Sequence, residues 1–315
     1  MGGGAVIAAR GIGRAAALAS AWLVGLVQRP DGAGLPPLAT VLQSLVGCWI
    51  CERGLAAGAG DRRLRALARE VARRLDLERP ALVALRRCDA GLVLLCGGIL
   101  RALGCPSATL EAFIRTLAHA VPGRGPGAPE LFPVRFLLNR LGLHPHPGRH
   151  ELRAPDLLQA PNPFRGGESS VRSVASRVAA ATAYGRTVCS PDAELRKRLA
   201  VVVPVWMLAC LREYDLELGA LLLRTMGYLR LRRDRVFREG LAFLLVQQQP
   251  DGRFGFLARD VARRRAAARR RDAVHALHLP LTVCCLWAIA EASNPRFVLL
   301  RLDRRAWRRL RPGTP

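Results

Sequence analysis

Residues 238–254 constrain the fold of this chain more than any other stretch. They read as a helix that stops at a turn and is followed by an aromatic residue. Three leucines and then Gln248 recur at three- and four-residue steps, which is the period of a helix with one buried face. Pro250 and Gly252 predict the helix end and a turn, and Phe254 follows closely enough to fold back over that end. The amide of Gln248 can then bond backbone groups of a neighbouring helix. The stretch predicts a clasp between helices.

The same stretch resembles the QW motif, the repeat of the terpene-cyclase and prenyltransferase superfamily that includes squalene-hopene cyclase. The motif runs basic residue, Gly, two residues, aromatic, Leu, three residues, Gln, a short gap, Gly, one residue and Trp. The matching positions are Gly240, Phe243, Leu244, Gln248 and Gly252. This chain departs from the motif at Glu239, which follows Arg238, and at Phe254, which stands where Trp is usual. The resemblance implies an α/α toroid, a ring of helical pairs around a central cavity.

A degraded second copy of the clasp lies near the N-terminus, at residues 23–32. Its positions identical to the first copy are Gln28, Pro30, Asp31 and Gly32. Each copy precedes an apolar helix that begins near a Pro-Leu pair. We therefore expect an outer helix, a clasp and an inner helix at both ends of the chain.

The composition favours an all-α fold. Half of the residues are apolar and only 5% are aromatic, and Ala, Leu and Arg recur at helical spacing. We expect about a dozen helices, one of them over 81–103, which would form a toroid or partial toroid of about six helical hairpins. The helices expected to line its cavity are 38–55, 92–103, 201–209 and 281–290.

A segment rich in Pro and Gly, residues 121–167, interrupts the helical pattern around one short helix at 131–141. Such a segment is usually a functional loop, a lid or a linker. It separates an N-terminal helical arc, residues 1–120, from a C-terminal helical arc with the QW-like repeat, residues 168–315. We expect one domain overall, and two separate domains are the alternative.

The chain is strongly basic, with a net charge of +25. Of its 49 basic residues 48 are Arg and only Lys197 is Lys, which is typical of a GC-rich bacterial genome. The densest clusters begin at Arg230, Arg263 and Arg304. A surface of this charge would attract nucleic acid, anionic lipid or a diphosphate, although solvated helix faces explain the same runs.

Cysteine usage and hydropathy predict a cytoplasmic protein. The nine cysteines are odd in number and scattered through apolar helices, so they do not form a disulfide framework. The apolar runs fall short of the roughly twenty residues that span a bilayer. We expect no transmembrane span, while peripheral contact with an anionic surface stays open.

The acidic motifs of the superfamily's reactions are not present in the sequence, whose closest aspartates are nine residues apart. Asp215 and Glu217 come nearest to an acidic catalytic site between helices. As residues of a turn and a helix start, they equally suit a structural role.

Two histidines near a Pro-Leu helix start, His275 and His278, are the candidate metal ligands and acid-base groups. Protein prenyltransferases of the superfamily hold catalytic zinc partly through a His that lies just before a Thr. Here Thr282 matches that Thr and Leu281 occupies the ligand position, so the pair would form a displaced site. The alternative is a structural hydrogen-bonded pair.

Two functions follow from these observations. The first is a prenyltransferase- or squalene-cyclase-like protein of bacterial specialised metabolism, which binds an apolar isoprenoid or peptidyl substrate in a central cavity, with modification of that substrate left open. The second is a non-catalytic basic scaffold for an acidic partner, nucleic acid or a membrane surface. Whether the chain is an enzyme stays open, and no motif specifies a cofactor.

Overall fold

The computed structural model describes residues 3–27, 37–55, 61–77, 81–121, 132–144, 168–182, 184–185, 193–255, 271–294, 297 and 299. The regular elements within these ranges are all α-helices, so the predicted all-α fold is confirmed. They are α1 (Gly3–Val27), α2 (Leu38–Gly54), α3 (Asp61–Leu77), α4 (Ala81–Arg86), α5 (Ala90–Ala102), α6 (Ala108–Ala120), α7 (Phe132–Arg140), α9 (Glu168–Ala181), α10 (Ala193–Arg212), α11 (Leu216–Tyr228), α12 (Arg235–Val246) and α14 (Arg271–Ser293).

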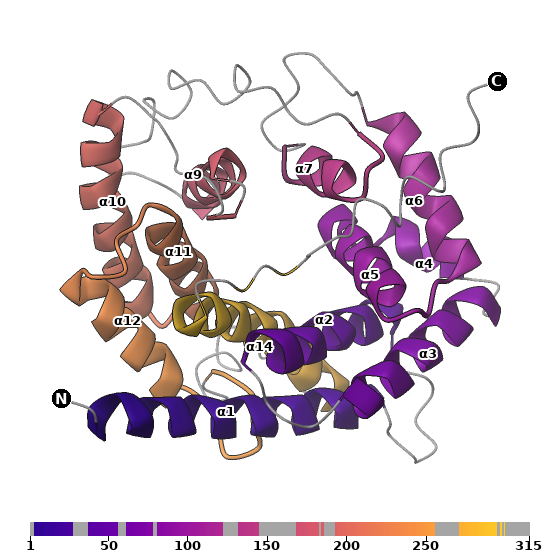
Figure 1. Ribbon diagram of the computed structural model, residues 1–315, viewed down its shortest axis with the longest axis horizontal. Helices are drawn as coiled ribbons and strands as arrows, with labels where there is room; N and C mark the ends of the chain where they lie inside the picture. Colours follow the sequence, from indigo (N-terminus) through magenta and orange to yellow (C-terminus); the bar gives the residue numbers. More distant parts are fainter. Residues whose placement is uncertain are drawn as a thin grey trace.

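Six of these helices contact one another in a closed cycle. Helix α2 contacts α5, α5 contacts α7, α7 contacts α9, α9 contacts α11, α11 contacts α14, and α14 returns to α2. The other helices pack against members of the cycle (Figure 1). Helices α1, α3 and α4 lie against α2, α6 lies against α5, and α10 and α12 lie against α11.

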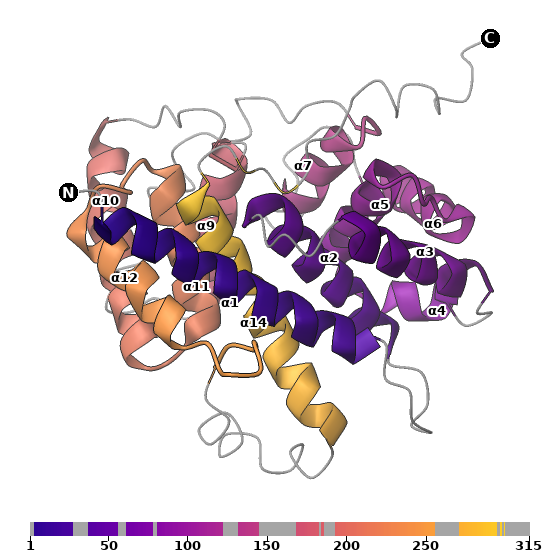
Figure 2. The same ribbon diagram turned by 60° about the horizontal axis from the view of Figure 1, so that its bottom comes forward.

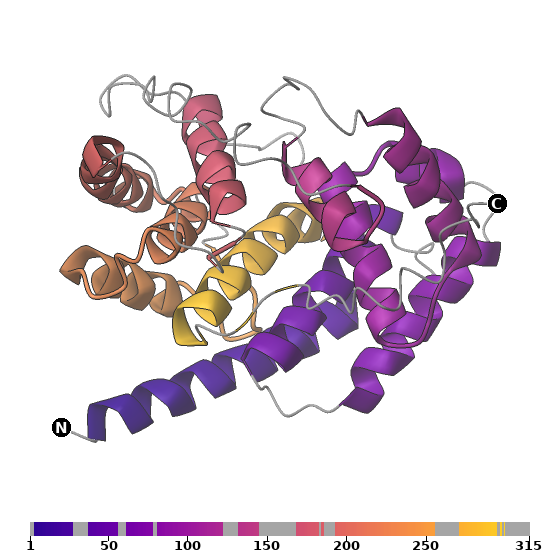
Figure 3. The same ribbon diagram turned by 45° about the horizontal axis from the view of Figure 1, so that its top comes forward.

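The cycle closes between segments from the two ends of the chain. Figure 3 shows α14, in yellow, between α11 and α2. A Cβ atom on Gly54 of α2 would lie 2.7 Å from the Cβ of Ala290, so the two helices approach closely where Gly54 has no side chain. Beyond α14, Phe297 is buried, and Trp49 Nε1 of α2 donates a hydrogen bond to the carbonyl of Leu299 at 2.8 Å. Both ends of the chain therefore share one core.

Two differences from the expected helices have physical causes. The helix expected at 81–103 is divided into α4 and α5, because Asp89 Oδ1 accepts a hydrogen bond from Leu92 N at 2.9 Å and caps a new helix. Residues 201–209, expected to line the inside, lie in α10, which packs against α11 and α12 outside the cycle. Helix α11 is buried along almost its whole length and takes the inner place, whereas Val201 of α10 is 65% exposed.

Helix α7 lies within the Pro- and Gly-rich segment and contacts both α5 and α9. It therefore connects the helices before the segment with those after it. The helix expected at 261–268 lies outside the described residues. No helix in the described parts of the chain is long and apolar enough to cross a membrane.

Candidate functional site

The turn after α12 packs directly on α1 (Figure 2). Gln248 Nε2 donates hydrogen bonds to the carbonyl of Ala15 in α1 at 2.8 Å and to the carbonyl of Gly252 at 3.0 Å. Gly252 has a φ of +97°, and a Cβ at this position would lie only 2.2 Å from the carbonyl oxygen of Leu18. The turn therefore needs glycine both for its conformation and for its approach to α1. The residues corresponding to the N-terminal copy, Gln28 and Gly32, lie outside the described residues.

Phe254 anchors the same turn to α14. Its side chain is fully buried, and its N–H donates to Thr282 Oγ1 at 3.1 Å. Its carbonyl accepts a hydrogen bond from His278 Nδ1 at 2.9 Å, which fixes the Nδ1-protonated tautomer of a ring that is 1% exposed. Gln248, Gly252, Phe254, Thr282 and His278 form what we call the clasp, which joins α12, α1 and α14. His278 thus makes a structural hydrogen bond through Nδ1, while its role as a metal ligand or acid-base group stays a prediction.

The other predicted catalytic residues lie at helix starts. Asp215 caps α11 through a hydrogen bond from Leu218 N to its Oδ1 at 3.0 Å. Glu217 pairs with Arg172 of α9 at 3.0 Å. The backbone of His275 belongs to α14, and its side chain lies outside the described residues. Among the residues that the structure describes, no group of three His, Cys, Asp or Glu could hold a metal ion.

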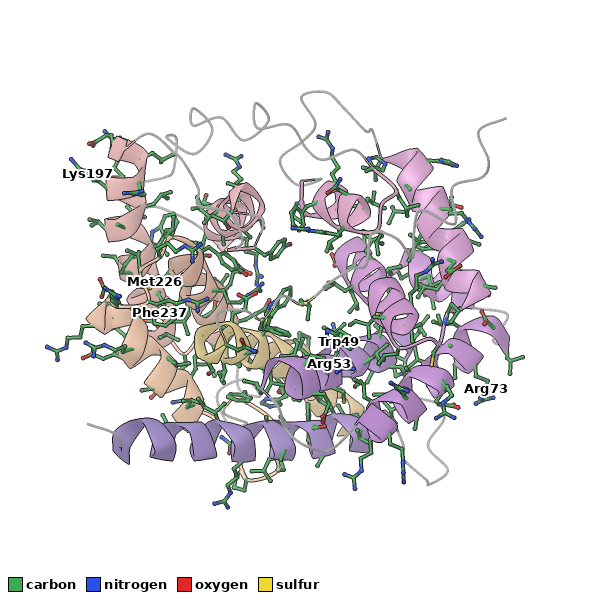
Figure 4. All side chains as sticks on the ribbon, viewed as in Figure 1. Trp49, Arg53, Arg73, Lys197, Met226 and Phe237 are labelled. Carbon is green, nitrogen blue, oxygen red and sulfur yellow. The ribbon has the colours of Figure 1, made fainter. Side chains whose placement is uncertain are left out.

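A pocket of about 360 Å³ lies between α10 and the end of α11. Its lining residues are Arg196, Lys197, Ala200, Tyr228, Leu229, Arg230 and Leu231. Three of them are cationic and none is acidic. Lys197, labelled in Figure 4 on α10, is the only lysine of the whole chain. The pocket therefore combines concentrated positive charge with an apolar floor.

One wall of the pocket is a helix end in a strained conformation. The N–H of Leu231 donates to the carbonyl of Met226 at 2.9 Å, which closes the end of α11. Arg230 between them has a φ of +66°, a left-handed conformation that costs a residue with a side chain about 1–2 kcal/mol. Its Nη2 donates to the carbonyl of Gly185 at 3.4 Å. A left-handed residue closed by such a bond is a common helix end, and Tyr214 ends α10 in the same way.

A buried polar network holds Tyr228, another lining residue of the pocket. The Tyr228 hydroxyl donates to Glu291 of α14 at 2.7 Å and accepts from Arg224 Nη2 at 2.8 Å. Arg224 Nε donates to Glu291 at 3.1 Å, and Trp287 Nε1 donates to the same carboxylate at 2.7 Å. The side chains of Arg224 and Glu291 are each 7% exposed. Glu291 therefore neutralises a buried cation and fixes the orientation of three donors at once.

The protonation of the network follows from its burial. Burial raises the pKa of Tyr228, and the nearby Glu291 carboxylate raises it further against the opposing effect of Arg224. Burial alone would lower the pKa of Arg224, but Glu291 and Tyr228 raise it above its usual value. The tyrosine is therefore neutral and the guanidinium charged at physiological pH.

Aromatic rings extend this network towards α7. The Arg224 Cζ atom lies 3.4 Å from the centroid of the Trp287 ring, a close cation–π contact. Tyr184 stacks on Trp287 with centroids 6.3 Å apart, and Phe136 of α7 lies 4.9 Å from Tyr184. Helices α7, α11 and α14 and the end of α9 are thus joined behind the pocket.

The structure brings together residues that the sequence did not predict as a site. Arg230 was recognised only as the start of a basic cluster, and Lys197 only as the single lysine; Tyr228 carried no signal. The basic clusters that begin at Arg263 and Arg304 lie outside the described residues. None of Asp215, Glu217 and His278 lines the pocket.

Comparison with known proteins places almost the whole chain in one family. Residues 14–297 match the family described as "Domain of unknown function (DUF6895)", and the chain belongs to it. Neither a curated protein nor a solved structure matches the chain.

Proposed function

We propose that this member of the DUF6895 family binds an amphipathic ligand with a phosphate or diphosphate head group, of the isoprenoid class, in the pocket between α10 and α11. The observation that carries the proposal is the convergence of Arg196, Lys197 and Arg230 on one pocket, whose described lining contains no acidic residue. Guanidinium and ammonium groups are the usual protein ligands of phosphate oxygens.

The apolar part of the pocket fits the rest of such a ligand. Leu229, Leu231 and the Tyr228 ring form apolar lining, and the volume of about 360 Å³ is in the range of small-molecule sites. Because the network around Glu291 holds Tyr228 rigidly, little ordering of this wall accompanies binding. The pocket lies at the edge of the helical cycle, where an anionic head group keeps access to water.

An α/α toroid related to terpene cyclases and prenyltransferases is part of the same proposal. Two observations support it: the closed cycle of six helices, and the bonds of Gln248 and Gly252 with α1. The proposed function is ligand binding, and it includes no chemical step. Asp215, Glu217 and His278 do not line this pocket, so their predicted catalytic role, like that of His275, stays a separate prediction.

Titration calorimetry with geranyl diphosphate, inorganic diphosphate and geraniol tests the pocket. We expect saturable binding of geranyl diphosphate, weaker binding of diphosphate and none of geraniol. The variant Lys197→Gln should weaken the binding of geranyl diphosphate by about tenfold to a hundredfold, the usual effect of losing a hydrogen bond to a charged group.

The matched control is Arg198→Gln, one residue further along α10. Arg198 carries the same charge, pairs with Glu194 at 3.2 Å and does not line the pocket. Because Arg198 is paired with Glu194 and offers no donor to the pocket, this variant should lose much less affinity than Lys197→Gln. Equal weakening in both variants, or no saturable binding by the parent, would refute the pocket.

A second candidate function is a basic scaffold for nucleic acid, supported by the net charge of +25. It predicts that affinity for a DNA duplex falls steeply with salt, with a slope that counts the phosphates contacted. Under this function Lys197→Gln and Arg198→Gln should weaken binding equally, so the same two proteins separate the candidates.

A further inference from the structure

The outer face of α10 carries an apolar stripe that no other part of the described structure covers. Val201 is 65% exposed, Val205 38% and Leu208 45%. Their spacing of four and three residues places all three on one side of the helix. A helix at the surface of a soluble domain normally presents polar residues on this side, so a continuous apolar stripe marks an interaction surface.

Positive charges border the stripe at both ends. Arg198 lies one turn before Val201 and Arg212 one turn after Leu208, and the rise of a helix places these two positions about 21 Å apart. Arg196 and Lys197 lie beside Arg198. The exposed acidic side chains of this region are Glu194, which pairs with Arg198, and Glu213. Cations therefore outnumber anions on this helix, in keeping with the charge of the whole chain.

We propose that α10 docks on an anionic lipid bilayer, with the apolar stripe at the boundary between head groups and acyl chains. Short aliphatic side chains flanked by Arg and Lys are what a helix lying in the plane of a membrane surface presents. Insertion into the apolar phase would remove the stripe from water, and the bordering cations would be attracted by the lipid phosphates. Nucleic acid would use the cations but leave the valines and the leucine exposed.

The region next to the stripe fits the same surface. Tyr214, just after α10, is 41% exposed and packs against Phe243 of α12 with ring centroids 5.8 Å apart. Exposed tyrosines favour the level of the lipid head groups, where one end of the ring is apolar and the other is hydrated. Val246 at the end of α12 is 74% exposed. Tyr214 therefore adds an exposed aromatic ring where α10 meets α12.

Docking would bring the pocket to the membrane. Lys197 and Ala200, which line the pocket, lie directly before Val201 on the same helix. A ligand with a long apolar tail could then pass between bilayer and pocket without crossing water. Docking itself goes beyond the proposed ligand binding and does not depend on it.

Sedimentation with vesicles tests the docking surface without any isoprenoid ligand. We expect the protein to bind vesicles of phosphatidylcholine with 30% phosphatidylglycerol, and binding to weaken as salt is raised. The variant Val201→Ser/Val205→Ser/Leu208→Ser should lower the partition coefficient at least tenfold. Its helical circular dichroism at the assay temperature should match that of the parent, because each of the three side chains is at least 38% exposed.

The matched control is Leu77→Ser/Val83→Ser, which removes exposed apolar side chains from α3 and α4, on the other side of the molecule (Figure 1). This variant should bind vesicles like the parent. Absence of vesicle binding, an equal loss in both variants, or a stripe that instead holds two copies of the chain together in size-exclusion chromatography would overturn the proposal. The calorimetric test of the pocket uses soluble ligands without vesicles. Failure of ligand binding and failure of membrane docking can therefore be told apart.

Discussion

The substitution Gly252→Ala tests the clasp, because a single methyl group meets the backbone of another helix. The added Cβ would lie 2.2 Å from the carbonyl oxygen of Leu18, 2.3 Å from its carbonyl carbon and 2.7 Å from the nitrogen of Ala19. Non-bonded heavy atoms rest at about 3.5–4 Å. Since all three atoms belong to the backbone of α1, no side-chain rotation relieves the overlap, and α1 has to move by about 1 Å.

The expected cost has three parts. The left-handed conformation costs alanine about 1–2 kcal/mol. Displacement of α1 stretches the bond between Gln248 Nε2 and Ala15, worth about 1 kcal/mol, and disturbs the packing of the fully buried Ala19 and Leu23, for which overpacked cores lose about 1–3 kcal/mol. We expect a total loss of about 4 kcal/mol in the free energy of unfolding.

The control is Gly104→Ala, at the end of α5. Gly104 has a φ of +73°, and a Cβ there meets no atom within 4 Å. This variant therefore carries the conformational cost alone, about 1–2 kcal/mol. Urea unfolding followed by circular dichroism measures both losses. Equal losses in the two variants would show that Gly252 does not pack against α1 and would refute the clasp.

Two further predictions concern carboxylates in hydrogen-bonded networks, one buried and one near the surface. Glu291→Gln leaves a buried guanidinium without its counter-charge and should lower the free energy of unfolding in urea by about 3–5 kcal/mol. Its control, Glu70→Gln in an exposed ion pair on α3, should cost less than about 1 kcal/mol. Similar costs in the two variants would contradict the buried network. Loss of water around Asp76 raises its pKa. Hydrogen bonds from Ser107 Oγ and the N–H of Thr109 at the start of α6 lower the pKa by more, so the folded-state pKa of Asp76 lies below the ordinary value. The stability that Asp76 contributes is then complete above its ordinary pKa of about 4 and is lost as pH falls through the folded-state pKa. The difference in free energy of unfolding between the parent and Asp76→Asn should therefore be constant from pH 7 to 5 and shrink below pH 4. A difference that grows on acidification would show that the pKa shift has the opposite sign.

Local chemistry made part of this structure predictable. The end of α12 and the turn at Gly252 follow from residues that are neighbours in sequence, because proline and glycine restrict the backbone wherever they stand. The all-α fold follows from composition and periodicity in the same way.

The contacts between distant segments were not predictable. Lys197 and Tyr228 meet only because α10 packs on α11, and the partner of His278 is a backbone carbonyl 24 residues away. The sequence predicted an inner helix at Val201 to Ala209 because its run of valines has the same pattern whether the side chains face the protein core or another apolar phase. Only the packing of α11 decides which helix faces inward.

The contact between α2 and α14 has a consequence for synthesis. More than 200 residues separate the end of α2 from the start of α14. At ribosomal rates this interval lasts roughly ten to forty seconds, and throughout it the surface of α2 that receives α14 remains open to solvent. A nascent chain with such a surface is a substrate for chaperones, and a chain that ends before residue 271 would keep it exposed and aggregate.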